Sequence, residues 1–153
     1  MKALFADVDG VLNSSRWFSR RQRAGVLDMT EIDPVATARI RRLARDTGTN
    51  IVLSSSWRRH NELAVRLRAQ GLEWDDQTPD LDERTSRQVN GYGHRGREIR
   101  AWLDAHPDVT QFAIVDDDPD AGEGDGLAPH FVKTSWVHGL TVAHVAQLRA
   151  LLV

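Results

Sequence analysis

The 153-residue sequence contains no cysteine. This absence excludes a disulfide scaffold, a thiolate metal site and a thiol nucleophile, and it fits a reducing compartment. Lysine is also scarce, at Lys2 and Lys133 only, so nearly all of the positive charge is arginine. No apolar run approaches the roughly 20 residues that a membrane span needs, and the run after Lys2 is too short for a signal peptide. We therefore expect a cytoplasmic protein with no membrane association.

The sequence has no overall basic character, since its net charge is -2. This argues against the global basic footprint typical of nucleic-acid-binding domains. The charges are unevenly distributed, however: residues 14–25 carry four arginines and no acid, whereas residues 116–125 carry six acids and no base. The hydrophobic content of 41% and charged content of 27% are ordinary for a globular protein, and the length predicts one domain with a sizeable core.

A short apolar run at residues 3–6 leads directly into Asp7, Asp9 and Gly10. The run is typical of a strand buried on both faces of a parallel sheet. Charged residues are rarely buried unless they are paired or bind a metal, and Gly10 allows a sharp turn directly after the two carboxylates. We therefore interpret this segment as a catalytic loop.

The rest of the sequence alternates between helical and extended patterns. Asp33 and Pro34 predict the start of a helix that ends at Gly48, and Asn61 is expected to cap the next helix. We expect residues 14–30 to form a loop or short hairpin, and residues 71–85 to be mostly loop with a short edge strand near residues 72–74. Further helices are predicted over residues 95–106 and 141–152, and further strands over residues 50–53, 111–115 and 130–133.

This alternation predicts an α/β fold with a mainly parallel central sheet and helices on both faces. In such sheets, ligands bind at the carboxyl ends of the strands. Asp7 and Asp9, Ser54, and the pair Asp116 and Asp117 each follow a predicted strand. Three distant segments should thus bring polar groups to one edge of the sheet.

Several aspartates at one edge suit Mg²⁺, which prefers carboxylate and water oxygens and is often shared with a substrate phosphate. The absence of histidine and cysteine from these segments argues against zinc. Asp7 can act as a nucleophile, and Asp9 is placed to be a general acid and then a base. Ser54 offers a hydroxyl to a phosphate oxygen, together with nearby backbone N–H groups, and Arg95 opens a helix where an anion is favoured. Gly10 and Ser55 are further candidates for substrate binding.

The sequence resembles the haloacid dehalogenase (HAD) superfamily, whose members are mostly Mg²⁺-dependent phosphatases with a Rossmann-like fold. Asp7-Val8-Asp9-Gly10 matches the first signature motif, Ser54 the second, Arg95 the third, and Asp116-Asp117 the fourth. The resemblance implies that Asp7 is the nucleophile and that Asp9 is the acid and base of an aspartyl-phosphate mechanism.

The resemblance also implies the metal ligands: Asp7, the main-chain carbonyl of Asp9, and Asp116 or Asp117. The third motif more commonly has a lysine, so Arg97 is the alternative to Arg95 there.

A more particular resemblance rests on the segments D-V-D-G-V-L-N, S-S-S-W-R, R-G-x-E-I-x-x-W-L and a late G-L-T. These are similar to the small HAD domains of RNA-repair and polynucleotide end-processing proteins. The resemblance implies removal of a phosphate, such as a 3′-phosphate, from a DNA or RNA end. Arg20 and Arg21, with Trp17 and Phe18 interleaved, would hold a strand by phosphate pairing and base stacking. Arg58 is a further candidate for substrate binding, and no protein partner can be inferred.

We expect one HAD-like domain over residues 1–153, with residues 14–31 and 72–94 as loops or minimal cap insertions. The alternatives are a phosphatase of nucleotides or sugar phosphates, and a non-catalytic module that binds metal or phosphate. Retention of both Asp7 and Asp9 favours an enzyme. Structural interpretations also remain: the arginines as a solvated face, the serines from Ser54 on as a helix cap, and Trp57 as a core residue.

Overall fold

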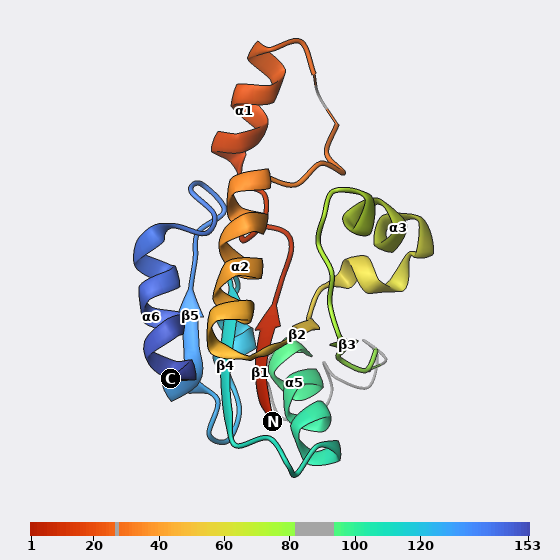
Figure 1. Ribbon diagram of the computed structural model, residues 1–153. Helices are drawn as coiled ribbons and strands as arrows, with labels where there is room; N and C mark the ends of the chain where they lie inside the picture. Colours follow the sequence, from red (N-terminus) through yellow and green to blue (C-terminus); the bar gives the residue numbers. More distant parts are fainter. Residues whose placement is uncertain (27, 82–93) are drawn as a thin grey trace.

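Strand β1 (Lys2–Ala6) lies at the centre of a five-stranded, all-parallel sheet with the order β3-β2-β1-β4-β5. The computed structural model describes residues 1–26, 28–81 and 94–153 (Figure 1). The predicted α/β fold with a parallel sheet is confirmed. The other strands are β2 (Asn50–Leu53), β3 (Asp76–Gln77), β4 (Gln111–Asp116) and β5 (Phe131–Lys133).

The central position of β1 explains its uniformly apolar sequence. Phe5 lies between Val52 of β2 and Ile114 of β4 in the register of the sheet. Residues 3–6 are all buried, because both faces of the strand are covered by helices. The register also brings the carboxyl ends of β1, β2 and β4 to the same edge.

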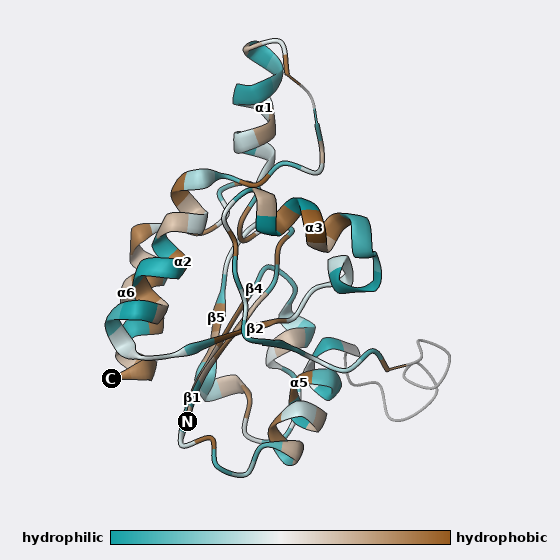
Figure 2. Ribbon diagram, turned by 45° about the vertical axis from the view of Figure 1, so that its right-hand side comes forward, coloured by the Kyte–Doolittle hydropathy of each residue, from teal (hydrophilic) through white to brown (hydrophobic). Residues whose placement is uncertain are grey.

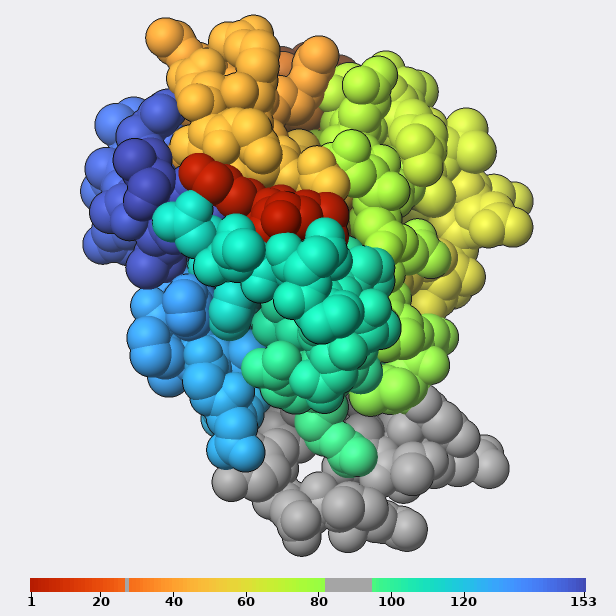
Figure 3. All heavy atoms as spheres, turned by 60° about the horizontal axis from the view of Figure 1, so that its bottom comes forward, coloured from red at the N-terminus to blue at the C-terminus, as the bar shows by residue number. Residues whose placement is uncertain are grey.

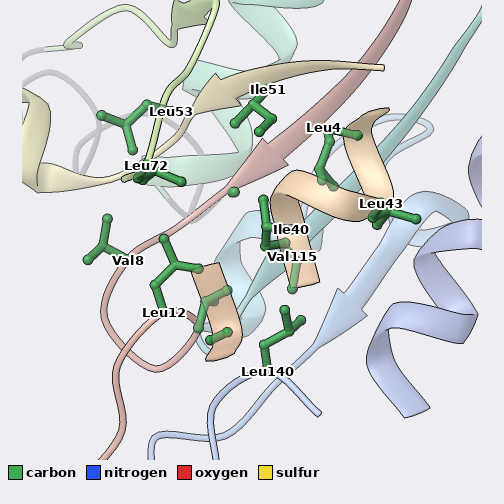
Figure 4. Close-up of a cluster of buried hydrophobic side chains, with 14 of the residues drawn as sticks. Leu4, Val8, Leu12, Ile40, Leu43, Ile51, Leu53, Leu72, Val115 and Leu140 are labelled. Atoms are coloured by element: carbon green, nitrogen blue, oxygen red, sulfur yellow. The ribbon is translucent and has the colours of Figure 1, made fainter. Parts of the chain in front are cut away.

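One face of the sheet is covered by α2 (Pro34–Thr47) and α6 (Val142–Leu152) (Figures 1 and 2). Figure 4 shows Leu4 and Val115 of the sheet packing with Ile40 and Leu43 of α2. As predicted, the Asp33 side chain caps α2 by accepting a hydrogen bond from the Val35 N–H. Gly48 ends the helix in the left-handed region, with φ of 64°. The capped ends hold α2 in register with the strands beneath it.

The opposite face is covered by α5 (His94–Ala105). Phe5 meets the indole of Trp102 edge to face, with ring centroids 5.2 Å apart, and Ile99 and Leu103 complete this second cluster. Figure 3 views the end of the sheet at which the strands begin, where the N-terminus lies between α2 and α5. Among the described residues, no helix is long and apolar enough to cross a membrane.

The loop or hairpin that we expected for residues 14–30 is wrong, because the structure places helix α1 (Ser15–Arg23) there. The Ser14 side chain caps this helix by accepting from the Trp17 N–H. Phe18 is its one buried residue and packs on the Trp136 ring at 6.0 Å. A single apolar anchor gives too little periodicity to identify a helix from sequence. Figure 1 shows α1 standing beyond the carboxyl ends of the strands.

Two smaller expectations also fail. Helix α3 (Asn61–Ala69) has His60 as its N-cap, without a side-chain hydrogen bond, and Asn61 is its first helical residue. The edge strand is β3 rather than residues 72–74, because Asp75 exchanges main-chain and side-chain hydrogen bonds with Ile51 and fixes the register there. Residues 82–93 of the second expected insertion lie outside the described residues.

Candidate active site

Three carboxylates meet at the carboxyl ends of β1 and β4. Asp7 directly follows β1, Asp116 is the last residue of β4, and Asp117 comes next in the chain. One carboxylate oxygen from each lies within 4.8 Å of the others. The strand pairing continues into this site, since the Asp7 N–H donates to the Val115 carbonyl at 3.1 Å. The structure thus brings together three of the four predicted metal-binding aspartates.

Gly10 makes the tight approach of the two aspartate-bearing loops possible. It has φ of 73°, in the left-handed region that favours glycine, and a Cβ at this position would overlap the Asp117 side chain. Its carbonyl accepts a hydrogen bond of 2.6 Å from the Thr134 hydroxyl. The predicted substrate-binding residue therefore also positions Asp117 against the first loop.

The side chain of Asp9 is held apart from the three-carboxylate cluster by two donors. Trp57 Nε1 donates to Asp9 Oδ2 at 2.8 Å, and Asn13 Nδ2 donates to Asp9 Oδ1 at 2.8 Å. The amide oxygen of Asn13 in turn accepts from the Gly10 N–H at 3.0 Å. Both carboxylate oxygens of the expected acid and base are thus oriented. Its main-chain carbonyl as a metal ligand stays a prediction.

Trp57 is a functional residue that the sequence interpretation missed. It is only 6% exposed, as expected for a core residue, but its indole N–H reaches Asp9. Trp57 belongs to the short 3-10 helix η1 (Ser56–Arg59), which follows β2 directly. Its place in the S-S-S-W-R segment, just past a strand end, was the available signal.

Ser54 and Ser55 lie at the end of β2, beside the catalytic loop. The Ser54 N–H donates to the Ala6 carbonyl at 2.9 Å, one residue before Asp7. The Ser54 hydroxyl oxygen is buried, and no described residue offers it a hydrogen-bond partner. The Ser55 side chain hydrogen-bonds to Asp7. Because buried polar groups are normally paired, the unpaired Ser54 hydroxyl suits a ligand oxygen at this site.

Arg95, the expected third-motif base, lies beside the aspartates at the start of α5. Its Nε is 3.9 Å from Asp116 Oδ2, and its side chain is only 16% exposed. The Arg95 N–H donates to Asp120 Oδ2 at 3.2 Å. A Cβ at Gly96 would overlap the Glu123 carbonyl, so glycine is what lets α5 approach the loop after β4. This geometry favours Arg95 over Arg97 as the motif residue.

Arg58, predicted to bind substrate, is instead placed in the interior. Its guanidinium is 2% exposed and forms an ion pair of 2.6 Å with Glu98 Oε1, which is fully buried. Arg58 Nη1 also donates to the Ser55 carbonyl at 2.6 Å. Glu98 was not predicted, yet its second oxygen accepts from Arg95 Nη1 at 2.9 Å. Glu98 therefore joins the Ser55 segment to Arg95.

Arg20 and Arg21, the two other predicted substrate-binding residues, lie on α1 and not in the aspartate cluster. Arg21 is paired with Glu31, with Nε 2.7 Å from Oε2, and its guanidinium lies over the Trp17 ring at 5.6 Å. Arg20 is exposed and lines a pocket at the base of α1.

Burial and like charge make the bare cluster electrostatically unfavourable. Burial raises the pKa of Asp7 to about 7. It raises the pKa of Asp116 to about 9, with the neighbouring Asp7 charge adding to the effect. The pKa of Asp117 is also raised, mainly by burial, whereas the positive charge of Arg95 opposes the shift at Asp7 and Asp116. Such a set of oxygens is suited to a divalent cation, which would neutralise it.

Comparison with known families gives one match. The model described as "HAD domain in Swiss Army Knife RNA repair proteins" matches residues 3–145. No curated protein and no solved structure matches the chain. The matched span includes every residue of the site described above.

Proposed function

The chain belongs to the family of HAD domains found in Swiss Army Knife RNA repair proteins, and we propose that it is a Mg²⁺-dependent phosphomonoester hydrolase acting on polynucleotide ends. The observation that carries the proposal is the cluster of Asp7, Asp116 and Asp117, whose oxygens lie within 4.8 Å of one another beside Arg95. Family membership supports a phosphatase-type activity, and the cluster supplies the chemistry for it.

The residues present fit a magnesium ion. Asp7 and one or both of Asp116 and Asp117 would hold it, with the main-chain carbonyl of Asp9. These are hard oxygen donors, and Asp7 and Asp116 have raised pKa values that an adjacent cation would lower. When bound, Mg²⁺ neutralises the carboxylates and the substrate phosphate so that they can approach one another.

In the first half-reaction, a carboxylate oxygen of Asp7 attacks the phosphorus of the substrate. The new bond to Asp7 forms while the bond to the leaving sugar oxygen breaks, and the Asp9 carboxyl gives that oxygen its proton. Trp57 and Asn13 orient Asp9 for this transfer. Ser54 and Arg95 bind the phosphoryl oxygens, on which charge is distributed in the transition state.

In the second half-reaction, water attacks the phosphorus of the aspartyl phosphate. Asp9, now ionised, accepts the proton of that water, the bond between phosphorus and Asp7 breaks, and inorganic phosphate leaves. Asp7 returns as a carboxylate and Asp9 as a carboxyl, so that the residues are ready for another turnover.

A polynucleotide end as substrate is supported by the family description and by the arginines of α1. In the described part of residues 14–31, the structure has a single short helix rather than a folded cap domain. An active site covered so little can accept the end of a long molecule. We propose a 3′-phosphate as the preferred group.

The test is a substrate panel for the full chain with MgCl₂, read as release of inorganic phosphate. It compares 3′-phosphate and 5′-phosphate oligonucleotides of DNA and RNA with nucleotides and sugar phosphates. The expected result is the highest kcat/KM for a 3′-phosphate oligonucleotide, with loss of activity in EDTA. Higher values for nucleotides or sugar phosphates would contradict the polynucleotide assignment. No release from any substrate would contradict the enzyme and favour a binding module.

A further inference from the structure

A pocket of about 450 Å³ lies at the base of α1, outside the aspartate cluster. Its walls come from α1, the first turns of α2 and the segment that enters α6. Figure 1 shows these three parts of the chain meeting at the end of the sheet toward which the strands point. The charged and aromatic residues of its lining are Arg16, Trp17, Arg20, Asp33, Arg39 and His138.

The lining is strongly cationic. Three guanidiniums face one carboxylate, that of Asp33, whose Oδ1 already accepts the Val35 N–H at 2.8 Å. Arg16 Nη1 lies 3.5 Å from His138 Nδ1, so two nitrogen-bearing side chains converge with no acid between them. The amino ends of α2 and α6 add their positive dipole ends to the same pocket. The lining thus selects for an anion.

The pocket is physically continuous with the catalytic loop. Its wall residue Ser14 directly follows Asn13, which holds the carboxylate of Asp9. Its wall residue Leu140 donates its N–H to the Val11 carbonyl at 2.9 Å. From Asp9 to Ser14 the chain can span at most about 18 Å. An anion in the pocket therefore lies within a few nucleotides of a phosphate at the aspartates.

We propose that this pocket is a second subsite, which binds a backbone phosphate of a single-stranded polynucleotide while its end occupies the aspartate site. This inference rests on the proposed function. Arg16 and Arg20 pair with the phosphate, for which the planar guanidinium is well suited, and the Trp17 ring supplies an aromatic surface of the kind on which bases stack. The subsite thus favours a strand over a small phosphomonoester.

The test measures binding without turnover. Fluorescence anisotropy in EDTA follows a labelled, single-stranded 3′-phosphate oligonucleotide of about eight nucleotides, within the usual site-size range. The test variant is Arg16→Ala with Arg20→Ala. The matched control is Arg23→Ala with Arg42→Ala, which removes the same charge from two exposed positions of α1 and α2 outside the pocket.

We expect the test variant to bind at least tenfold more weakly, since charge-assisted hydrogen bonds to phosphate are lost. Its slope of log affinity against log salt should fall by roughly 1.4, about 0.7 for each phosphate contact removed. The control should change less than twofold. Arg16→Gln with Arg20→Gln, which keeps polar side chains over the pocket, should show the same loss if charge is responsible.

Equal losses in the test and control variants would overturn the inference, because net charge alone would then explain the binding. Competition by inorganic phosphate as tight as that by the oligonucleotide would also overturn it, since the pocket would then hold a free anion. Because the assay needs no turnover, an inactive wild type would overturn the proposed function and leave this result standing. An active wild type with unchanged binding in the test variant would do the opposite.

Discussion

The indole Nε1 of Trp57 donates a hydrogen bond of 2.8 Å to the Oδ2 atom of Asp9. This contact connects the segment after β2 with the catalytic loop after β1. It orients the carboxyl that must reach the leaving oxygen. We expect Trp57→Phe, which keeps an aromatic ring but removes the N–H, to lower kcat by about 10²-fold, the scale of a small misplacement of a catalytic group. Steady-state kinetics on a phosphorylated oligonucleotide checks this.

Trp102→Phe is the matched control for that variant. Trp102 is 4% exposed, and its Nε1 also donates to a carboxylate, Asp76 Oδ2, at 2.8 Å. It lies under α5 and away from the aspartates. Both variants lose packing, but only Trp57→Phe should lose kcat. A similar fall in kcat for both would show that the effect is loss of packing and not loss of Asp9 orientation.

Glu98 should be essential for stability as well as for activity. Removing one partner of a buried ion pair leaves an uncompensated charge and costs about 3–5 kcal/mol. Glu98→Gln leaves Arg58 in that state and also frees Arg95 from its position. We expect a loss of this size in the free energy of unfolding, measured by urea denaturation.

An exposed ion pair on the same helix gives the comparison. Asp104→Asn breaks the pair with Arg100, whose side chains are 66% and 41% exposed, and should cost less than about 1 kcal/mol. A cost for Glu98→Gln no larger than that for Asp104→Asn would contradict a structural role for the buried network.

Gly10→Ala tests the approach of Asp117 to the first loop. An alanine at Gly10 meets two penalties, the left-handed φ of 73° and overlap with the Asp117 side chain. Gly25→Ala meets only the first, with φ of 80° and open space around it, and should cost about 1–2 kcal/mol. Gly10→Ala should cost more and should also weaken Mg²⁺ binding, measured by calorimetry. Equal costs and unchanged Mg²⁺ affinity would mean that the contact is unimportant.

The metal-free protein should lose stability as pH rises. In the folded state burial raises the pKa of Asp7 to about 7 and that of Asp116 to about 9, from the ordinary value of 3.8. Between about pH 4 and pH 9 the folded state therefore retains protons that the unfolded chain has lost, so unfolding becomes more favourable as pH rises. Mg²⁺ competes with these protons, and its stabilising effect should grow over the same range. Thermal melting with EDTA or MgCl₂ measures both trends.

Asp116→Asn should separate the two effects. It removes a buried charge, so the Tm at pH 8 in EDTA should rise, while the gain in Tm from MgCl₂ should shrink. Asp104→Asn, at an exposed acid, should change neither trend. A metal-free Tm that is independent of pH, or an unchanged response of Asp116→Asn to Mg²⁺, would contradict the electrostatic account of the cluster.

The positions of Asp7, Ser54 and Asp116 at one edge of the sheet could be predicted, because each follows an apolar run and parallel strands share their carboxyl edge. The helix after Asp33 was predictable from its capping residues. Helix α1 was not, since Phe18 alone anchors it and its partner, Trp136, is distant in sequence.

The contacts within the site were beyond reach for a related reason. Arg58 looks like a surface cation in sequence, and only the fold shows that Glu98 buries it. Trp57 looks like a core residue, and only the fold shows that its N–H faces Asp9. Sequence patterns indicate which residues are apolar or charged, but the pairing of side chains across elements depends on the tertiary structure.

The central claim is that Asp7 carries out Mg²⁺-dependent phosphoryl transfer. The most direct test is the rate of phosphate release from a generic aryl phosphate by the wild type and by Asp7→Asn, each with MgCl₂ and with EDTA. An aryl phosphate needs no contact with α1, so the result does not depend on the strand subsite. We predict Mg²⁺-dependent turnover by the wild type and a loss of at least about 10³-fold in Asp7→Asn, as expected when a nucleophile is removed. Equal turnover by the two proteins, or none by the wild type, would contradict the claim.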